Sequence, residues 1–213
     1  MNLRRKKTVN YIEQIAKYDY KLGGKLRESY SRWIETLSID DFNDFLDLIY
    51  EFKEDIMRGL GRLLQTIGQF RAYSLEEYIY QLIRRRVRIP RSMDVYWNED
   101  VAIWKLNSYT YTVRFDILIG SKNNKYVEPA IIVEAKVEVD APRLKNVFMN
   151  FILAKTLKPN VKTILVYVNW NASQILKYIT LKYVDRLYWF GSGCIGSVDE
   201  FIDYLNQAIS SIR

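Results

Sequence analysis

The stretch IIVEAKVEV, residues 131–139, has the apolar composition of a buried β-strand but places two opposite charges inside it. Glu134 and Lys136 are two residues apart, so in a strand they project from the same face. Burying an ionised side chain without a partner is very costly. A pair of this kind therefore persists either as part of a self-neutralising ion cluster or as part of a site that binds a cation.

Three strands are expected to form an antiparallel meander that includes this stretch. They lie at 100–107, 110–119 and 129–139. The connection between the second and the third, GSKNNKYVE, is rich in Gly, Ser and Asn, which are typical of hairpin turns. With the hairpin centred near Lys125, the pairing register of the two strands follows from the residue numbers.

In that register the two numbers of each pair add up to about 250, so Asp116 lies opposite Glu134. Asp116, Glu134 and Lys136 then converge on one face of the sheet with a net charge of minus one. Two adjacent oxygen donors with residual negative charge suit Mg²⁺, which binds one or two carboxylates and retains water molecules. The pattern predicts a candidate magnesium site, with a structural ion cluster as the alternative.

The composition excludes several kinds of chemistry. The 213 residues contain no histidine and one cysteine, Cys194. Histidine-based nucleophilic catalysis, His and Cys-cluster metal sites, and an internal disulfide are therefore excluded. The net charge of +7, from 32 Lys and Arg against 25 Asp and Glu, favours a polyanionic partner such as nucleic acid. No uncharged apolar run approaches the roughly 20 residues of a membrane span.

The chain is expected to consist of two regions, a helical N-terminal region at 1–70 and a region of alternating strands and helices at 71–213. Helices are predicted at 8–22 and 25–37. Because glycine disfavours helix interiors, we expect the pair Gly23-Gly24 to separate them.

A third helix is expected to begin at Ser38, a suitable N-cap, and to continue to Phe70. Its apolar residues recur with heptad-like gaps of three and four and are Phe42, Phe45, Ile49, Phe52, Ile56, Leu60, Leu63, Ile67 and Phe70. A helix of about 30 residues would be roughly 45 Å long. The seam therefore predicts a homodimer through the N-terminal helices, or, alternatively, coverage by the first two helices folding back on it.

Another helix is predicted from Ser74, as its N-cap, to Arg86. Glu76 lies on the shoulder of the apolar face of this helix, whereas Glu77 points away from that face. Glu76 can therefore reach into the domain. The alternative is that both are first-turn acids, which the helix dipole favours.

The pattern Asp-x17-Glu-x-Lys, preceded by a helix that carries a glutamate, resembles the catalytic core of the PD-(D/E)xK nuclease superfamily. The matching pieces are Glu76 in SLEEYIYQLI, Asp116 in VRFDILI, and Glu134 with Lys136 in IIVEAKVEV. Phe115 stands where the family often has proline. The resemblance is closest to the Holliday-junction-resolvase-like nucleases and to the nucleases of archaeal spindle-shaped viruses.

The resemblance implies an α/β fold with a restriction-endonuclease-like core, in which a mixed central sheet follows the order αβββαβ. A coiled-coil-like helical extension would precede it. The remaining elements of such a core are expected as helices at 143–157, 171–183 and 197–213 and strands at 161–169 and 187–190.

The activity that the resemblance implies is that of a metal-dependent DNA endonuclease, selective for branched DNA or recombination intermediates. Asp116, Glu134 and the backbone carbonyl of Ala135 would hold Mg²⁺ or Mn²⁺, with Glu76 as an additional ligand. Lys136 would position the attacking water and help to deprotonate it. The alternative is a non-catalytic DNA-binding or assembly module on a degenerate nuclease fold.

Candidate DNA contacts outside this site are basic residues: Arg84, Arg85, Arg88 and Lys145. The alternative for the arginines is the solvated C-terminal end of a helix, which cations favour. No apolar segment of a secretory signal follows the basic N-terminus. We expect a cytoplasmic protein without membrane association, in the host cytoplasm should it be viral.

Overall fold

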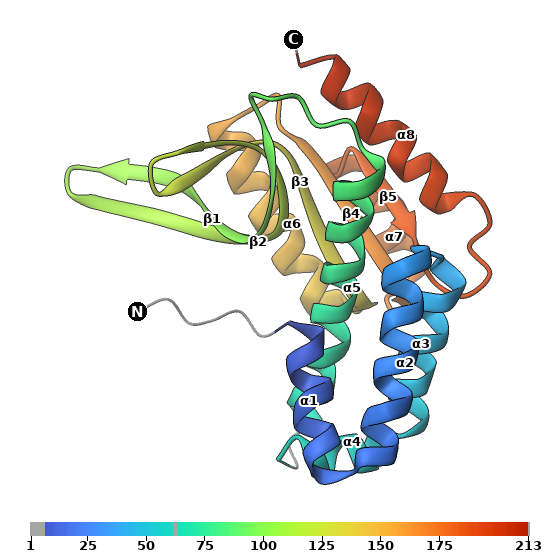
Figure 1. Ribbon diagram of the computed structural model, residues 1–213. Coiled ribbons are helices and arrows are strands. Elements are labelled where there is room, and N and C mark those ends of the chain that lie inside the picture. The colour runs from blue at the N-terminus through green and yellow to red at the C-terminus, as the bar shows by residue number, and fades with distance from the viewer. Residues whose placement is uncertain (1–6, 62–63, 213) are drawn as a thin grey trace. The chain divides into compact units, whose positions relative to one another are not determined.

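Helix α5, Leu64–Arg86, runs through the division of the chain into two units (Figure 1). Met1–Gln81 forms the helical unit, and Leu82–Arg213 forms the sheet unit. The computed structural model describes residues 7–61 and 64–212. The boundary predicted after residue 70 also falls inside α5, which continues without a break through that position.

The helical unit is built around an aromatic cluster. Its helices are α1 (Thr8–Tyr18), α2 (Tyr20–Thr36), α3 (Ile39–Glu51), α4 (Lys53–Gly59) and the first part of α5. The ring of Phe42 stacks on that of Tyr78 at 4.4 Å, and Trp33 meets Phe42 edge to face at 5.6 Å. Large aromatic side chains supply most of the apolar area of such a core, and paired rings add about 0.5–1.5 kcal/mol each.

The prediction of one long helix from Ser38 to Phe70 is wrong, because the chain turns after Glu51 and again at Gly61. Gly61 has a φ of +96°, which side-chain-bearing residues rarely adopt. The buried seam residues are Phe42, Phe45, Ile49, Ile56, Leu60 and Phe70. Leu63 lies outside the described residues. Aromatic rings of α1 and α2 contact the seam, as in the pairs Tyr11–Phe70 and Trp33–Phe42. The structure therefore favours the alternative of helices folded back over the seam.

The first two helices separate at Asp19, not at Gly23-Gly24 as predicted. Asp19 is extended, with a φ of −134°, and its carboxylate accepts a hydrogen bond of 3.0 Å from the Leu22 N–H. This N-cap begins α2 ahead of the glycines. A Cβ on Gly23 would lie 2.3 Å from the Cβ of Ala16, whereas a Cβ on Gly24 would meet nothing within 4 Å. Gly23 thus permits the close approach of α1 and α2.

Alanine substitutions at the two neighbouring glycines are expected to have opposite effects. Gly23→Ala should lower the free energy of unfolding by about 1–3 kcal/mol, because α1 must move away from α2. Gly24→Ala should raise it by roughly 0.5–1 kcal/mol, because alanine loses less backbone entropy in a helix. Urea unfolding followed by helical circular dichroism measures both. Equal effects of the two substitutions would contradict the close-contact role of Gly23.

The sheet unit contains one five-stranded sheet in the order β1-β2-β3-β4-β5. Its strands are β1 (Asp94–Leu106), β2 (Tyr109–Asn123), β3 (Tyr126–Val139), β4 (Lys162–Trp170) and β5 (Arg186–Trp189). The first three are antiparallel, and β3, β4 and β5 are parallel. The pairs Ile117↔Val133 and Leu118↔Ile132 confirm the register predicted from the hairpin. A bulge at Ile119/Gly120 shifts the register nearer the turn.

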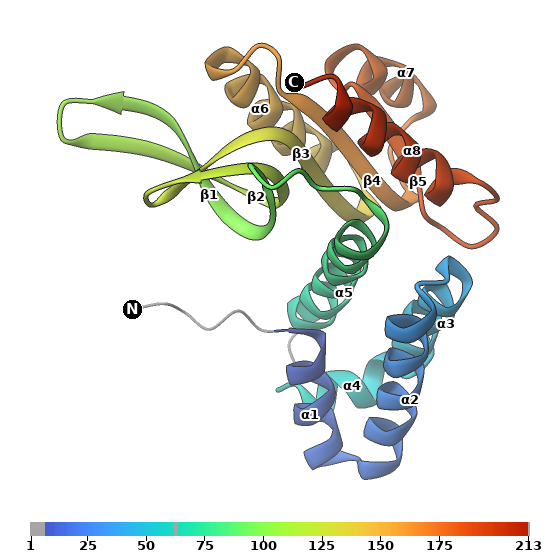
Figure 2. The same ribbon diagram turned by 45° about the horizontal axis from the view of Figure 1, so that its top comes forward.

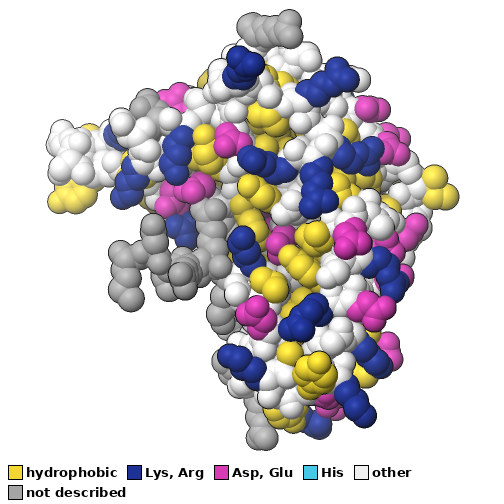
Figure 3. All heavy atoms as spheres, viewed as in Figure 1, with side chains coloured by type: hydrophobic (Ala, Val, Ile, Leu, Met, Phe, Trp, Pro, Cys, Tyr) yellow, Lys and Arg dark blue, Asp and Glu magenta, His cyan; other side chains and the backbone are white. Residues whose placement is uncertain are grey.

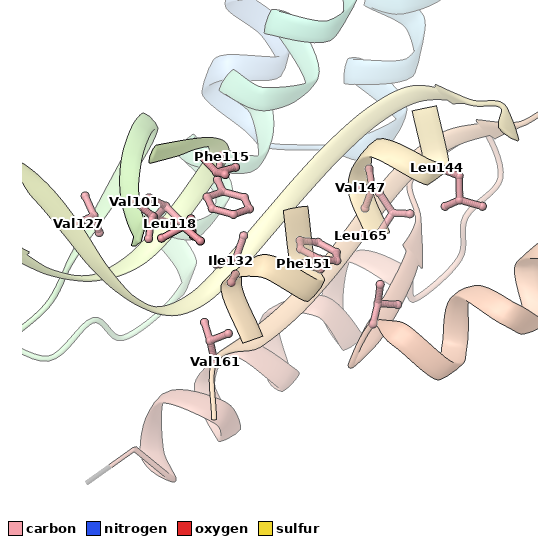
Figure 4. Packing of buried hydrophobic residues seen from close by; sticks show 14 of the residues in the cluster. Val101, Phe115, Leu118, Val127, Ile132, Leu144, Val147, Phe151, Val161 and Leu165 are labelled. Atoms are coloured by element: carbon pink, nitrogen blue, oxygen red, sulfur yellow. The ribbon is translucent and has the colours of Figure 1, made fainter. Parts of the chain in front are cut away.

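Helices α6 (Ala141–Leu157), α7 (Gln174–Tyr183) and α8 (Ser197–Ser210) confirm the predicted helical segments. The apolar face of α6 packs on the sheet against Ile132 and Leu165 (Figure 4). Its packing residues are Leu144, Val147, Phe151 and Ala154. In Figures 1 and 2, α8 lies on the side of the sheet away from α6 and α7. Among the described residues no helix is long and apolar enough to cross a membrane.

Candidate active site

The candidate site lies where the ladder between β2 and β3 ends. The last pair, furthest from the hairpin turn, is Ile117↔Val133. Asp116 on β2 and Glu134 on β3 are the next residue of each strand beyond this pair. Glu134 and Lys136 follow Ile132 at intervals of two, so all three project from the face that packs against α6. The hairpin register therefore brings the charged side chains to one face of the sheet.

The three predicted side chains are in direct contact. The Nζ of Lys136 donates hydrogen bonds of 2.7 Å to Oδ2 of Asp116 and of 2.7 Å to Oε2 of Glu134. The N–H of Ala135 also donates to Oδ2 of Asp116, at 2.8 Å. This backbone contact fixes the carboxylate beside the ammonium group. Sequence reasoning missed it, because nothing in the residue pattern shows which N–H groups lie beyond the end of a ladder.

Burial strongly affects the ionisation of Glu134, whose side chain is 4% exposed. Burial, and after it the neighbouring Asp116 carboxylate, raise the pKa of Glu134, Lys136 opposes both effects, and the net result is a pKa of about 7. Glu134 therefore exchanges its proton near neutral pH in the metal-free protein.

Lys136 remains protonated in the metal-free protein. Burial by itself lowers the pKa of Lys136, but the adjacent Asp116 and Glu134 carboxylates outweigh it and hold the pKa above the ordinary value of a lysine. An ammonium group that keeps its proton can donate hydrogen bonds and stabilise negative charge, but it cannot accept a proton from water. The predicted role of Lys136 in deprotonating the attacking water stays a prediction.

The raised pKa of Glu134 predicts a pH dependence of stability. The unfolded chain loses this proton near pH 4.5 and the folded protein near pH 7, so between these values the folded state binds more protons and stability falls as the pH rises. The loss is on the order of 3 kcal/mol. Glu134→Gln should remove this slope. Urea unfolding followed by tryptophan fluorescence at several pH values measures this pH dependence, because four of the five tryptophans belong to the sheet unit: Trp97, Trp104, Trp170 and Trp189. The prediction is contradicted if the stability of Glu134→Gln depends on pH in the same way as that of the unmodified protein.

The two helix glutamates lie in the middle of α5, not in a first turn, so the prediction of Ser74 as an N-cap is wrong. The Ser74 hydroxyl donates to the Phe70 carbonyl at 2.7 Å, as within a continuing helix. Glu77 is 3% exposed, and its carboxylate accepts hydrogen bonds of 3.1 Å from both the Thr8 N–H and the Tyr30 hydroxyl. It therefore fastens α1 and α2 to α5, contrary to the prediction that it points away from the apolar face.

Glu76 is buried as well, with 7% of its surface exposed, and its charge acts on Tyr11. It belongs to the helical unit, whereas Asp116, Glu134 and Lys136 belong to the sheet unit. Its role as an additional metal ligand stays a prediction.

The predicted DNA-contacting residues lie on the surface of the sheet unit. Arg84 forms an ion pair of 2.6 Å with Asp94, which neutralises much of its charge. The N–H of Arg88 donates to the side chain of Asn206 at 3.0 Å, and the Arg88 side chain is exposed. Arg85 and Lys145 are also exposed. All four are accessible to a phosphate backbone, and their contact with DNA stays a prediction.

The donor set fits a hard divalent cation. Asp116 and Glu134 each place an oxygen 2.7 Å from the Nζ of Lys136, so the two carboxylates converge closely enough to share one cation. The described residues contain no group of three or more His, Cys, Asp or Glu side chains suited to a metal ion. Mg²⁺ tolerates this, because it commonly takes one or two carboxylates and completes its shell with water and substrate oxygens.

The fold is similar to that of the native BbvCI A2B2 tetramer, solved at low resolution. The TM-score is 0.52 at 13% sequence identity, and the match covers 88% of this chain and 86% of that chain. Neither a protein-family model nor a curated protein matches the sequence. The likeness shows the fold alone. That fold is mixed α/β, with a five-stranded mixed sheet.

Proposed function

We propose that the protein is a metal-dependent DNA endonuclease that hydrolyses phosphodiester bonds. The observation that carries this proposal is the contact of Asp116, Glu134 and Lys136 at the end of the β2–β3 ladder. The arrangement combines two hard anionic donors with one fixed cationic donor. A restriction-endonuclease-like fold supports the same class of reaction.

Each side chain has a distinct task in this proposal. Asp116, oriented by the Ala135 N–H, and Glu134 hold Mg²⁺ or Mn²⁺, with the Ala135 carbonyl and Glu76 as further candidate ligands. The bound cation would polarise the scissile phosphate and lower the pKa of a coordinated water. Lys136, as an ammonium, orients the phosphate and stabilises the negative charge that develops on its oxygens. Burial of Glu134 keeps bulk water from screening these charges.

Polyanion binding is supported by the net charge of +7 and by the exposed side chains of Arg85, Arg88 and Lys145. The sequence resemblance to junction-resolving nucleases supports branched DNA as the substrate. The predicted dimer through the N-terminal helices is less well supported, because most of its seam is buried within one chain.

A second candidate function is a DNA-binding or assembly module without catalysis. The observation that favours it is the salt bridge itself, since Lys136 already neutralises one of the two carboxylates and a self-sufficient ion cluster needs no metal.

Cleavage assays separate the two candidates. Supercoiled plasmid and a branched oligonucleotide are incubated with Mg²⁺ or Mn²⁺, and Glu134→Gln is compared with the unmodified protein. The matched control is Asp100→Asn, which removes a carboxylate paired with Arg114 at 2.9 Å on neighbouring strands outside the site. Cleavage by the unmodified protein and the control alone supports the nuclease. If all three bind the branched DNA and none cleaves it, the non-catalytic module replaces it.

A further inference from the structure

The strands β1 and β2 continue beyond the body of the sheet as a two-stranded arm, residues 101–113, which projects from the sheet unit in both ribbon views (Figures 1 and 2). The register near its end pairs Trp104 with Tyr111 and Leu106 with Tyr109. Paired residues, and residues two apart, share a face of a hairpin. The arm therefore gathers four large apolar side chains on one face, defined as the arm patch.

The arm patch is unusually exposed. The exposed fractions are 63% for Trp104, 62% for Leu106, 79% for Tyr109 and 58% for Tyr111. A two-stranded hairpin alone is at best marginally stable in water, and contiguous exposed apolar surface marks interaction sites. The arm patch thus has the properties of a surface that is covered in the functional assembly.

Charge indicates what covers the arm patch. Between 101 and 113 the chain carries one charged residue, Lys105, which pairs with Thr110 on the opposite face of the arm. The end of the arm, at the left of Figure 3, shows uncharged and hydrophobic side chains. DNA binding relies on cations that contact phosphates, whereas cores of protein interfaces are rich in Tyr and Trp and poor in charge. A protein partner therefore fits the arm patch better than nucleic acid.

A groove of about 550 Å³ lies at the root of the arm. Its lining includes the apolar residues Trp104, Val127, Pro129 and Leu157 and the charged residues Lys105, Lys125, Glu128 and Lys158. Trp104 belongs to both the groove and the arm patch, so the groove adjoins the arm patch.

We propose that the occupant is a second copy of this chain. Two arms related by a two-fold axis pack antiparallel, patch against patch, and the tip of each arm enters the groove at the root of the other. With roughly 200 Å² for a fully exposed side chain of this size, the arm patch supplies about 500 Å² per copy, so two copies bury about 1,000 Å² in total before the groove walls are added. This reaches the roughly 1,000 Å² that a specific interface needs. An uncharged patch is self-complementary, as an isologous contact requires.

The test is the oligomeric state without DNA or divalent cations. Light scattering should give twice the 25.4 kDa of one chain at micromolar concentration. The double variant Leu106→Ser/Tyr109→Ser should raise the dimer dissociation constant roughly 100-fold or more and give the single-chain mass. The matched control Thr110→Ala/Thr112→Ala changes the opposite face of the arm, outside the groove lining, and should stay dimeric. Circular dichroism checks that each variant is folded.

Cross-linking adds a positional readout. The sole cysteine, Cys194, is buried, so Tyr111→Cys, near the middle of the arm and therefore near the two-fold axis, offers one accessible thiol. A bismaleimide should then link two chains. A monomeric unmodified protein would overturn the proposal, as would a dimer that both double variants preserve. The dimer proposal is also overturned if the unmodified protein is monomeric and the Leu106→Ser/Tyr109→Ser variant no longer binds DNA. That result would assign the arm patch to nucleic-acid binding. The measurement uses no substrate, so its failure leaves the proposed nuclease activity untouched.

Discussion

Asp116→Asn is expected to lower the rate of DNA cleavage by roughly 10²- to 10³-fold or more, with the fold intact. Asparagine keeps a carbonyl oxygen that can accept the Ala135 N–H, so the local backbone retains its partner. The substitution removes the negative charge that meets the Lys136 ammonium at 2.7 Å and one anionic donor for the cation. Catalysis is therefore lost while positioning is largely kept.

Single-turnover cleavage of a labelled branched oligonucleotide, over a range of Mg²⁺ concentrations, measures this effect. The control Asp100→Asn should cleave at the unmodified rate. Gel-shift binding in EDTA should be similar for all three proteins, because phosphate contacts depend on surface cations outside the site. An Asp116→Asn variant as active as the control would remove Asp116 from the catalytic assignment.

Lys136→Met is expected to destabilise the sheet unit by about 3–5 kcal/mol at pH 8, because it leaves Asp116 and the buried Glu134 as adjacent carboxylates without their cation. The cost should shrink as the pH falls. Burial and Asp116 already raise the pKa of Glu134 to about 7 with the lysine in place, so without Lys136 the carboxyl takes up a proton more readily and the repulsion disappears.

Tryptophan fluorescence during urea unfolding, at pH 5 and pH 8, measures this difference. The control Lys158→Met breaks an exposed ion pair with Glu128 and should change stability by less than about 1 kcal/mol at either pH. Added Mg²⁺ should restore more stability to Lys136→Met than to the unmodified protein, because the cation replaces the missing ammonium. Equal costs for both lysines would show that the cluster contributes little to folding.

The local pattern of the sequence located most of the sheet unit, although β1 begins at Asp94 and not at the predicted residue 100. Strong apolar alternation located β2 and β3, and a turn near Lys125 set their register, so the pairing of Ile117 with Val133 follows from counting alone. Since that register is fixed by which side chains must be buried, it also brings Asp116 beside Glu134. The candidate site was predictable because two short-range rules, alternation and hairpin geometry, determine it.

The helical unit was less predictable, because helix ends depend on contacts between distant residues. The pair Gly23-Gly24 is typical of a helix break, yet Gly23 lies inside α2. Because Gly23 has no side chain, Ala16 of α1 can approach the backbone of α2 closely. Glu77 reads as a solvent-facing acid, but it accepts hydrogen bonds from Thr8 and Tyr30. Neither partner is a neighbour along the chain, so no periodicity indicates them.

The sequence by itself determined the order of strands and helices in the sheet unit and the three residues that meet on it, because period-two burial and turn chemistry act over a few residues. Only the tertiary structure decided where the N-terminal helices break, that their seam is buried within one chain, and that the arm leaves Trp104 and Tyr111 exposed. Burial is a property of the packed chain, since the same apolar side chain is covered or exposed according to which distant elements reach it.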